Sequence, residues 1–316
     1  MRDLPVGGLQ GGIFGILEYL SQTNNNLDII DEDLRFKFVD DATVLEIINL
    51  LSIGMASHNA KLRVPYEIAW HNQVIPFENL RSQDYLKKIN DWSISMKMEL
   101  NLKKTKTMTF NYSKNHQFST NISLNEETIE DVRDCKLLGT LITHDLKWED
   151  NTQMLTKRAY SRMQILYKIK EFNAPIEDQI IIYKTFVRCL LEFSCQVWHS
   201  MLTKTQTNDL ERVQKCCLKL ILDINYKTYK HALIMTGLET LEDRREMLCL
   251  RFANNCLKSE KTKNMFPLNE KTYMPTRQRE KFTVNKANTE RYKNSAIPYM
   301  QRLLNNSTIN YNIYVK

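Results

Sequence analysis

The feature that most constrains the fold of this chain is a change in the spacing of its apolar residues near residue 150. Before that point, segments such as 34–39 and 105–110 alternate two kinds of side chain, which is the two-residue period of a half-buried β-strand. From residue 151 onward the spacing becomes three to four, as in helices that pack on one face. The sequence therefore predicts an α+β fold, with a partial antiparallel sheet and helices over 1–150, a helical bundle over 151–225, and a helical extension with an irregular basic tail over 226–316.

Three helices are expected in the bundle. The first buries Ala159, Met163 and Leu166, and the third begins at the capping pattern formed by Thr203 and Gln206. The stripe expected on the second helix consists of Tyr183, Phe186, Val187, Leu190, Ser194 and Val197. The third helix is expected to bury Leu210, Val213, Cys217 and Leu220 or Ile221. Trp198 and His199 are expected in the core rather than on a binding surface.

Two adjacent carboxylates, Asp40 and Asp41, follow the strand pattern of 34–39 and are expected at or beside a tight hairpin turn. Carboxylates held so close repel each other, and either protonation or a hard divalent cation relieves the repulsion. An Asp-Asp pair is more often a solvated loop than a metal site, so the surrounding sequence has to decide between the two.

Charge is unevenly distributed along the chain. Residues 1–112 carry 12 Lys and Arg against 14 Asp and Glu, whereas the remainder carries 32 against 23. A basic C-terminal part is what a polyanion-binding surface requires, although an ordinary solvated surface with a lysine excess has the same composition. The apolar content is enough for a sizeable core. The sequence has no apolar run of the ~18 residues that a membrane span needs and no signal-peptide cleavage pattern. We therefore expect an intracellular protein, cytoplasmic or nuclear.

The seven cysteines are scattered through apolar helical patterns, which suits a reducing compartment. Cys189, Cys195 and His199 match no zinc-binding spacing, and buried thiols in helix cores are the commoner case.

Three further segments carry candidate binding residues. A glycine-rich run around Gln10 and Gly11 allows close approach of a flat partner, but it lacks the ending of a phosphate-binding loop. Lys104 is expected in the turn before the strand 105–110 and Lys106 in that strand, and by themselves they indicate only surface lysines. Leu138 and Gly139 lie between two short apolar runs, as expected of a hairpin.

The run 7–11, followed by Phe38-Val39-Asp40-Asp41, resembles the adjacent palm motifs of reverse transcriptases, specifically of the non-LTR (LINE-type) retrotransposon family. Segments 191–199 and 210–215 are similar to the thumb-side region of that family, and 294–298 resembles its C-terminal end, so the resemblance covers nearly the whole chain. Leu9, Gly12 and Ile16 depart from the residues that are usual in the family.

The resemblance implies RNA-directed DNA synthesis with Mg²⁺, or Mn²⁺, held by Asp40 and Asp41, which would be the catalytic residues. It also implies that Gln10, Gly11, Lys104 and Lys106 lie near the nucleotide substrate and template, and that Leu138-Gly139 grips the primer backbone. The expected partners are an RNA template, a DNA primer and deoxynucleoside triphosphates, with no membrane.

The family mechanism needs another aspartate from a strand that precedes the glycine-rich loop, but only six residues precede Gly7. We therefore expect a truncated palm over 1–150, with an insertion near 52–80, that is inactive alone. Two alternatives of another class are a non-catalytic nucleic-acid-binding module and an inert retroelement remnant.

Overall fold

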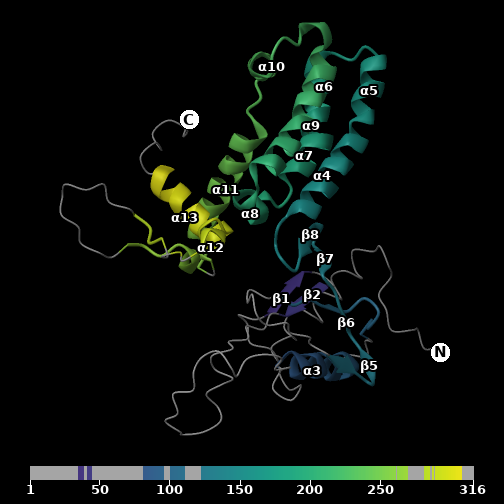
Figure 1. The fold of residues 1–316 in the computed structure, drawn as a ribbon, viewed down its shortest axis with the longest axis vertical. Helices are drawn as coiled ribbons and strands as arrows, with labels where there is room; N and C mark the ends of the chain where they lie inside the picture. The colour runs from purple at the N-terminus through teal and green to yellow at the C-terminus, as the bar shows by residue number, and fades with distance from the viewer. Residues whose placement is uncertain are drawn as a thin grey trace, which may run out of the picture. The chain divides into compact units, whose positions relative to one another are not determined.

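The computed structural model describes residues 35–38, 41–44, 81–95, 100–110, 122–260, 262–269, 281–284, 287 and 289–307 (Figure 1). The chain divides into two compact units, Met1–Cys135 and Lys136–Lys316. The insertion predicted near 52–80 and much of the predicted basic tail lie outside the described residues.

The first unit contains one helix and several short strands. β1 (Arg35–Phe38) pairs antiparallel with β2 (Asp41–Val44), and β4 (Ser123–Leu124) pairs antiparallel with β5 (Glu127–Thr128). β3 (Lys106–Thr107) pairs parallel with β6 (Glu130–Asp131). The helix α3 (Arg81–Ser95) is joined to β4 by the Gln83 amide, whose Nε2 donates to the Ser123 carbonyl at 2.6 Å and whose Oε1 accepts from the Ser123 N–H at 3.1 Å.

These strands correct the predicted sheet. Those in the described residues form four separate two-stranded sheets rather than one antiparallel sheet, and no polymerase palm is identified among them. The strand predicted over 105–110 is limited to Lys106–Thr107, because its partner β6 offers only two residues to pair with. The described part of the chain is mostly helical with small strands, which agrees with the predicted α+β class at that coarser level.

The second unit is helical. It is preceded by a hairpin in which β7 (Asp134–Leu137) pairs with β8 (Thr140–Thr143), and the division between the two units falls within β7. The bundle consists of α4 (Glu149–Arg162), α5 (Gln164–Glu171), α6 (Ile176–Ile182), the π-helical turn Tyr183–Arg188, α7 (Cys189–Glu192), α8 (Cys195–Trp198) and α9 (Lys204–Leu222). The chain continues through α10 (Tyr229–Thr236), α11 (Leu241–Leu257), α12 (Glu290–Lys293) and α13 (Ala296–Ser307). Within this unit α4, α6 and α9 run side by side, and α13 lies against α11 (Figure 1).

α9 begins and packs as predicted. Thr203 and Gln206 form a capping box, in which the Gln206 N–H donates to Thr203 Oγ1 at 3.2 Å and the Thr203 N–H donates to Gln206 Oε1 at 2.8 Å. Leu210, Val213 and Cys217 are fully buried. α9 contacts α4, α5, α6, α10 and α11, so it is the central helix of the unit.

The helix before α9 departs from the predicted stripe. Phe186 and Val197, predicted in the core, are 44% and 48% exposed. Tyr183 and Val187 are buried as predicted, and the other buried residues of this stretch are Leu191, Cys195 and Trp198. The π-helical turn and the left-handed Ser194 (φ 51°) shift the phase of the helix, and a strict 3.6-residue period misses both. The stripe predicted on the first helix, Ala159, Met163 and Leu166, is confirmed as buried.

A buried polar network fixes α9 in the bundle. The Gln214 amide, fully buried, accepts from the Tyr183 hydroxyl at 2.5 Å and donates to the Tyr229 hydroxyl at 2.8 Å and the Glu239 carbonyl at 2.9 Å. The Tyr229 hydroxyl in turn donates to the Glu211 carboxylate, which also accepts from the Leu241 N–H at 3.1 Å. A buried network satisfied in this way favours one arrangement of its helices.

Trp198 and His199 are buried, as the sequence predicted. The Arg245 Nε, on α11, donates to His199 Nδ1 at 3.3 Å, and the guanidinium lies 5.8 Å from the centre of the Trp198 ring. Burial, together with the neighbouring Arg245 charge, lowers the pKa of His199 from 6.5 to about 4. His199 is therefore neutral at physiological pH and accepts a hydrogen bond in the core.

The depressed pKa of His199 predicts a pH-dependent stability. Between pH 6.5 and about 4 the unfolded chain binds a proton that the folded chain does not, so the free energy of unfolding falls as the pH drops through this window. The expected loss is about 3 kcal/mol, and it levels off below the folded pKa. His199→Asn, which keeps an acceptor for Arg245, should flatten the urea-unfolding profile, whereas His144→Asn at an exposed turn should leave it unchanged. An unaltered profile in His199→Asn would contradict the assignment.

Candidate nucleic-acid interface

The solvent-facing side of α9 carries three cations in register, Arg212, Lys215 and Lys219. Their spacing of three and four residues places them on one face of the helix. Arg212 and Lys219 are exposed and Lys215 is half-buried, while the opposite face of α9 lies in the core. The cations therefore form a short row whose direction follows the helix axis.

Tyrosine rings flank this row on both sides. The Lys215 Nζ lies 5.0 Å from the centre of the Tyr229 ring, and the Lys219 Nζ lies 5.6 Å from that of Tyr226, which follows the end of α9. On the other side Tyr160, from α4, is 37% exposed and interacts with Cys216 and Arg212 of α9. We call the set Arg212, Lys215, Lys219, Tyr160, Tyr226 and Tyr229 the α9 strip.

The α9 strip is positively charged toward solvent. Asp209 pairs with Arg212 at 3.3 Å, but both side chains are largely exposed, so the pair is weak and open to exchange. Glu211 is 8% exposed, and its carboxylate is occupied by Tyr229 and Leu241 in the core. Lysine and arginine side chains bind phosphate oxygens, and tyrosine faces stack on bases, so this chemistry suits a nucleic-acid strand.

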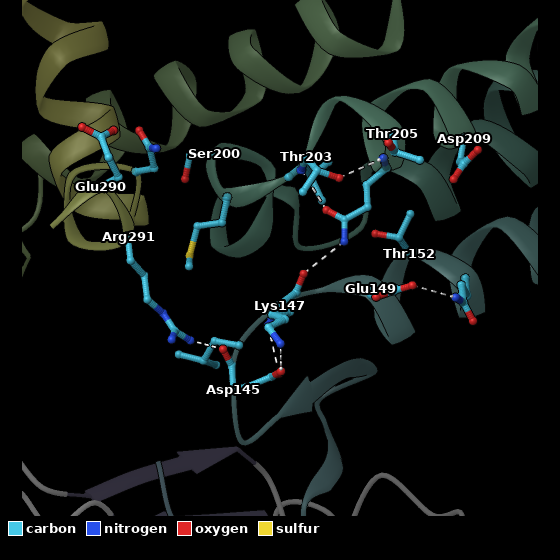
Figure 2. A pocket seen from close by; sticks show the side chains of 16 residues that line it. Asp145, Lys147, Glu149, Thr152, Ser200, Thr203, Thr205, Asp209, Glu290 and Arg291 are labelled. Carbon is cyan, nitrogen blue, oxygen red and sulfur yellow. Dashed lines mark hydrogen bonds and ion pairs between the residues drawn. The ribbon is translucent and has the colours of Figure 1, made fainter. Parts of the chain in front are cut away.

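A cavity of about 560 Å³ opens at the start of α9 (Figure 2). Four carboxylates line it, those of Asp145, Glu149, Asp209 and Glu290, with Lys147 and Arg291. Partial burial alone would raise the pKa of Asp145, but hydrogen bonds from Thr143 and Lys147 outweigh that effect and lower the pKa to about 2. The cavity is thus a poor site for phosphate.

The same cavity shows how the segment after β8 is held to the helices. The Gln206 Nε2 donates to the Lys147 carbonyl at 3.1 Å, and Arg291 of α12 donates to the Asp145 carbonyl (Figure 2). Gln206, which completes the capping box of α9, therefore also positions the chain that leads out of the β7–β8 hairpin.

Of the predicted carboxylate pair, the structure describes Asp41. The antiparallel register of β1 and β2 pairs Phe38 with Asp41, which is the first residue of β2. The antiparallel pairing of β1 with β2 agrees with the hairpin that the sequence predicts. Asp40, Gln10 and Gly11 lie outside the described residues.

The predicted lysines lie in a turn and a strand of the first unit. The Lys104 N–H donates to the Asn101 carbonyl at 3.0 Å, in the turn expected before the strand, and its side chain is exposed. Lys106 of β3 forms an ion pair with Glu130 of β6. A phosphate at Lys106 would therefore have to displace Glu130.

Leu138 and Gly139 form the turn of the β7–β8 hairpin, as predicted. Leu138 has φ 46° and is 48% exposed, and Gly139 has φ 88°. A Cβ added at Gly139 would lie 3.1 Å from Cε1 of Phe193, the residue between α7 and α8. Glycine is thus required here both by the backbone conformation and by the contact with the ring.

Sequence reasoning missed the α9 strip as a unit. The spacing of Arg212, Lys215 and Lys219 is the signal of a basic face that could have found it. Nothing in the sequence indicated that Tyr160, some fifty residues upstream, flanks the same face.

Comparisons of the chain with protein-family models, with curated proteins and with solved structures found no match. Within the described ranges, no helix is both long and apolar enough to cross a membrane. The same ranges contain no cluster of three or more His, Cys, Asp or Glu side chains placed to hold a metal ion.

The contact of Gly139 with Phe193 predicts that adding a methyl group destabilises the fold more at Gly139 than at Gly237. Gly139→Ala should lower the free energy of unfolding by about 2 kcal/mol, because a strained φ and a crowded Cβ add together. Gly237→Ala is the matched control, since Gly237 also has a positive φ but no atom within 4 Å of its Cβ position. It should cost only about 1 kcal/mol. Phe193→Leu should recover part of the difference, and equal costs at the two glycines in urea unfolding would contradict the contact.

Proposed function

We propose that this chain is part of a non-LTR retrotransposon reverse transcriptase, an RNA-directed DNA polymerase, and that its helical unit holds the RNA template and DNA primer through the α9 strip. The observation that carries the proposal is the strip itself, a row of cations flanked by tyrosines on a helix that a buried network holds in place. Such a surface binds the phosphate backbone and stacks on bases.

The segments that most resemble the thumb of this family supply two of the strip's cations and part of the core that supports it. Residues 191–199 supply Leu191 and Trp198 to the core, and 210–215 supply Leu210 and Val213 beside Arg212 and Lys215. Under the proposal this region clamps the primer–template, with 1–150 as part of the palm and 226–316 as a C-terminal extension.

The carboxylate pair fits a divalent-metal site in its donor chemistry. Asp41 is the first residue of β2 and Asp40 precedes it in the sequence, and carboxylate oxygens are the ligands that Mg²⁺ and Mn²⁺ prefer. Metal ions bound there would activate the primer 3′-hydroxyl and stabilise the leaving oxygen. Lys104 and Lys106 would contribute positive charge at the triphosphate, with Lys106 exchanging Glu130 for a phosphate oxygen. Leu138-Gly139 would contact the primer, and Gln10-Gly11 the template.

A second candidate is a non-catalytic nucleic-acid-binding module. It is favoured by the position of the α9 strip, whose six residues all belong to the second unit and need no group from the hairpin that carries Asp41. Under this candidate an Asp40→Ala/Asp41→Ala variant binds primer–template as tightly as the unmodified chain and with the same salt dependence, and no metal-dependent chemistry accompanies binding.

Removing the cations of the α9 strip should weaken binding in a salt-dependent way. For Arg212→Ala/Lys215→Ala/Lys219→Ala we expect at least about tenfold weaker binding to an RNA–DNA primer–template. We also expect the slope of log K against the logarithm of the salt concentration to become shallower by roughly 2 to 3, because counterions at those phosphates are no longer released. Fluorescence anisotropy over a salt series measures both quantities. Arg251→Ala/Lys258→Ala/Lys263→Ala on and after α11 removes the same charge and should have a smaller effect. Equal losses in the two triple variants would refute the strip as the binding surface.

Neutralising the carboxylate pair should remove a divalent-metal site. Asp40→Asn/Asp41→Asn is expected to bind less Mn²⁺ than the unmodified chain in a titration followed by electron paramagnetic resonance, since amides ligate hard cations poorly compared with carboxylates. Glu177→Gln/Asp178→Asn neutralises another adjacent pair, exposed at the start of α6, and should change binding little. A titration in which both double variants match the unmodified chain would exclude a metal site at the hairpin.

A further inference from the structure

Two buried thiols meet where α8 packs on α11. Cys195 is fully buried and Cys249 is 1% exposed, although 54 residues separate them in the chain. The Cys249 thiol donates to the Cys195 carbonyl oxygen, with 3.9 Å between Sγ and O, and each thiol affects the pKa of the other. None of the functions considered above uses these two residues.

The guanidinium of Arg245, one turn before Cys249 on α11, provides a second and independent observation. Arg245 is fully buried, and its Nη1 and Nη2 atoms make no hydrogen bond in the structure, while its Nε is bound to His199. Anionic groups near this buried charge stabilise it, and Glu211 makes the largest such contribution to the pKa of Arg245. The Cys195 thiolate would be a second anionic partner.

The environments of the two sulfurs differ in the direction that disulfide chemistry needs. The hydrogen bond from Cys249, and then the charge of Arg245, lower the pKa of Cys195 despite its burial. The same hydrogen bond and burial raise the pKa of Cys249. Of the two thiols, Cys195 is therefore the one whose thiolate form is more favoured.

We propose that Cys195 and Cys249 are a redox-active pair, which hydrogen peroxide converts into a disulfide that joins α8 to α11. The Cys195 thiolate attacks the peroxide, so that an S–O bond forms, the O–O bond breaks and hydroxide leaves. The Cys249 sulfur then attacks the sulfenic acid, so that the S–S bond forms, the S–O bond breaks and water leaves with the thiol proton. In total the two thiols lose two electrons and the peroxide is reduced to water.

Under this proposal, peroxide reaches the buried pair when α8 opens locally. α8 is a single turn, which begins after the left-handed Ser194 and continues into the 3-10 turn His199–Met201. A one-turn element of this kind opens locally at a lower cost than the whole bundle unfolds. Cys195 packs in the hydrophobic cluster of the bundle, with Trp198, whereas Cys249 packs in a separate cluster with Met300 of α13. The disulfide would therefore join these two clusters covalently.

Peptide mapping of the peroxide-treated full chain tests the proposal. The folded protein is treated with hydrogen peroxide, remaining thiols are blocked with iodoacetamide, and non-reduced digests are analysed by mass spectrometry. The expected result is a peptide that links Cys195 to Cys249, disappears on treatment with dithiothreitol and accompanies the loss of two titratable thiols. A chain in which Cys195 and Cys249 are still alkylated separately after treatment would overturn the proposal.

Variants test the two roles separately. Cys249→Ser should yield no link but a sulfenic acid at Cys195, which dimedone traps, while Cys217→Ser at another buried thiol should form the link as before. Arg245→Lys should slow oxidation of Cys195 by about tenfold, because a compact ammonium replaces the planar guanidinium beside the thiolate. An unchanged rate in a folded Arg245→Lys chain would contradict the role given to Arg245. The map of the unmodified chain decides the main claim without any variant.

Discussion

The hydrogen bonds of Gln214 determine how the helical unit presents its surface. This amide, buried on α9, uses both N–H groups and its oxygen to join Tyr183, Tyr229 and the Glu239 carbonyl. Rotation of α9 by even one position would break these bonds and leave buried polar atoms without partners, which is costly. The outward direction of Arg212 and Lys215 and the position of the Tyr229 ring therefore follow from an interaction inside the bundle.

Charge along α9 separates two surfaces. Asp209 and the other carboxylates of the neighbouring cavity lie in or beside the first half of the helix, whereas Lys215 and Lys219 lie in its second half. The dipole favours Lys219, which lies in the last turn, but it accounts neither for the other charges nor for the tyrosines beside them. A polyanion would be repelled at one end of α9 and attracted along the rest, which gives the proposed interface a direction.

Much of the helical unit could be predicted from the sequence, because its signals are local. The capping box at Thr203, the buried Leu210 and Cys217, and the hairpin at Leu138-Gly139 all follow from short patterns. The exposed Phe186 was missed because a π-helical turn changes the period, and the buried Arg245 because its helix reads as an ordinary amphipathic one. Tyr160 joins the α9 strip only through tertiary packing, which no local pattern records.

Photo-crosslinking tests the central claim, that nucleic acid binds along α9, most directly. A primer–template that carries 5-iodouracil would be irradiated with the chain, and the crosslinked peptides identified by mass spectrometry. The account predicts crosslinks at Tyr160, Tyr226 and Tyr229, with competition by unlabelled primer–template. Crosslinks confined to peptides from α11 and α13, with none on the tyrosines around α9, would contradict it.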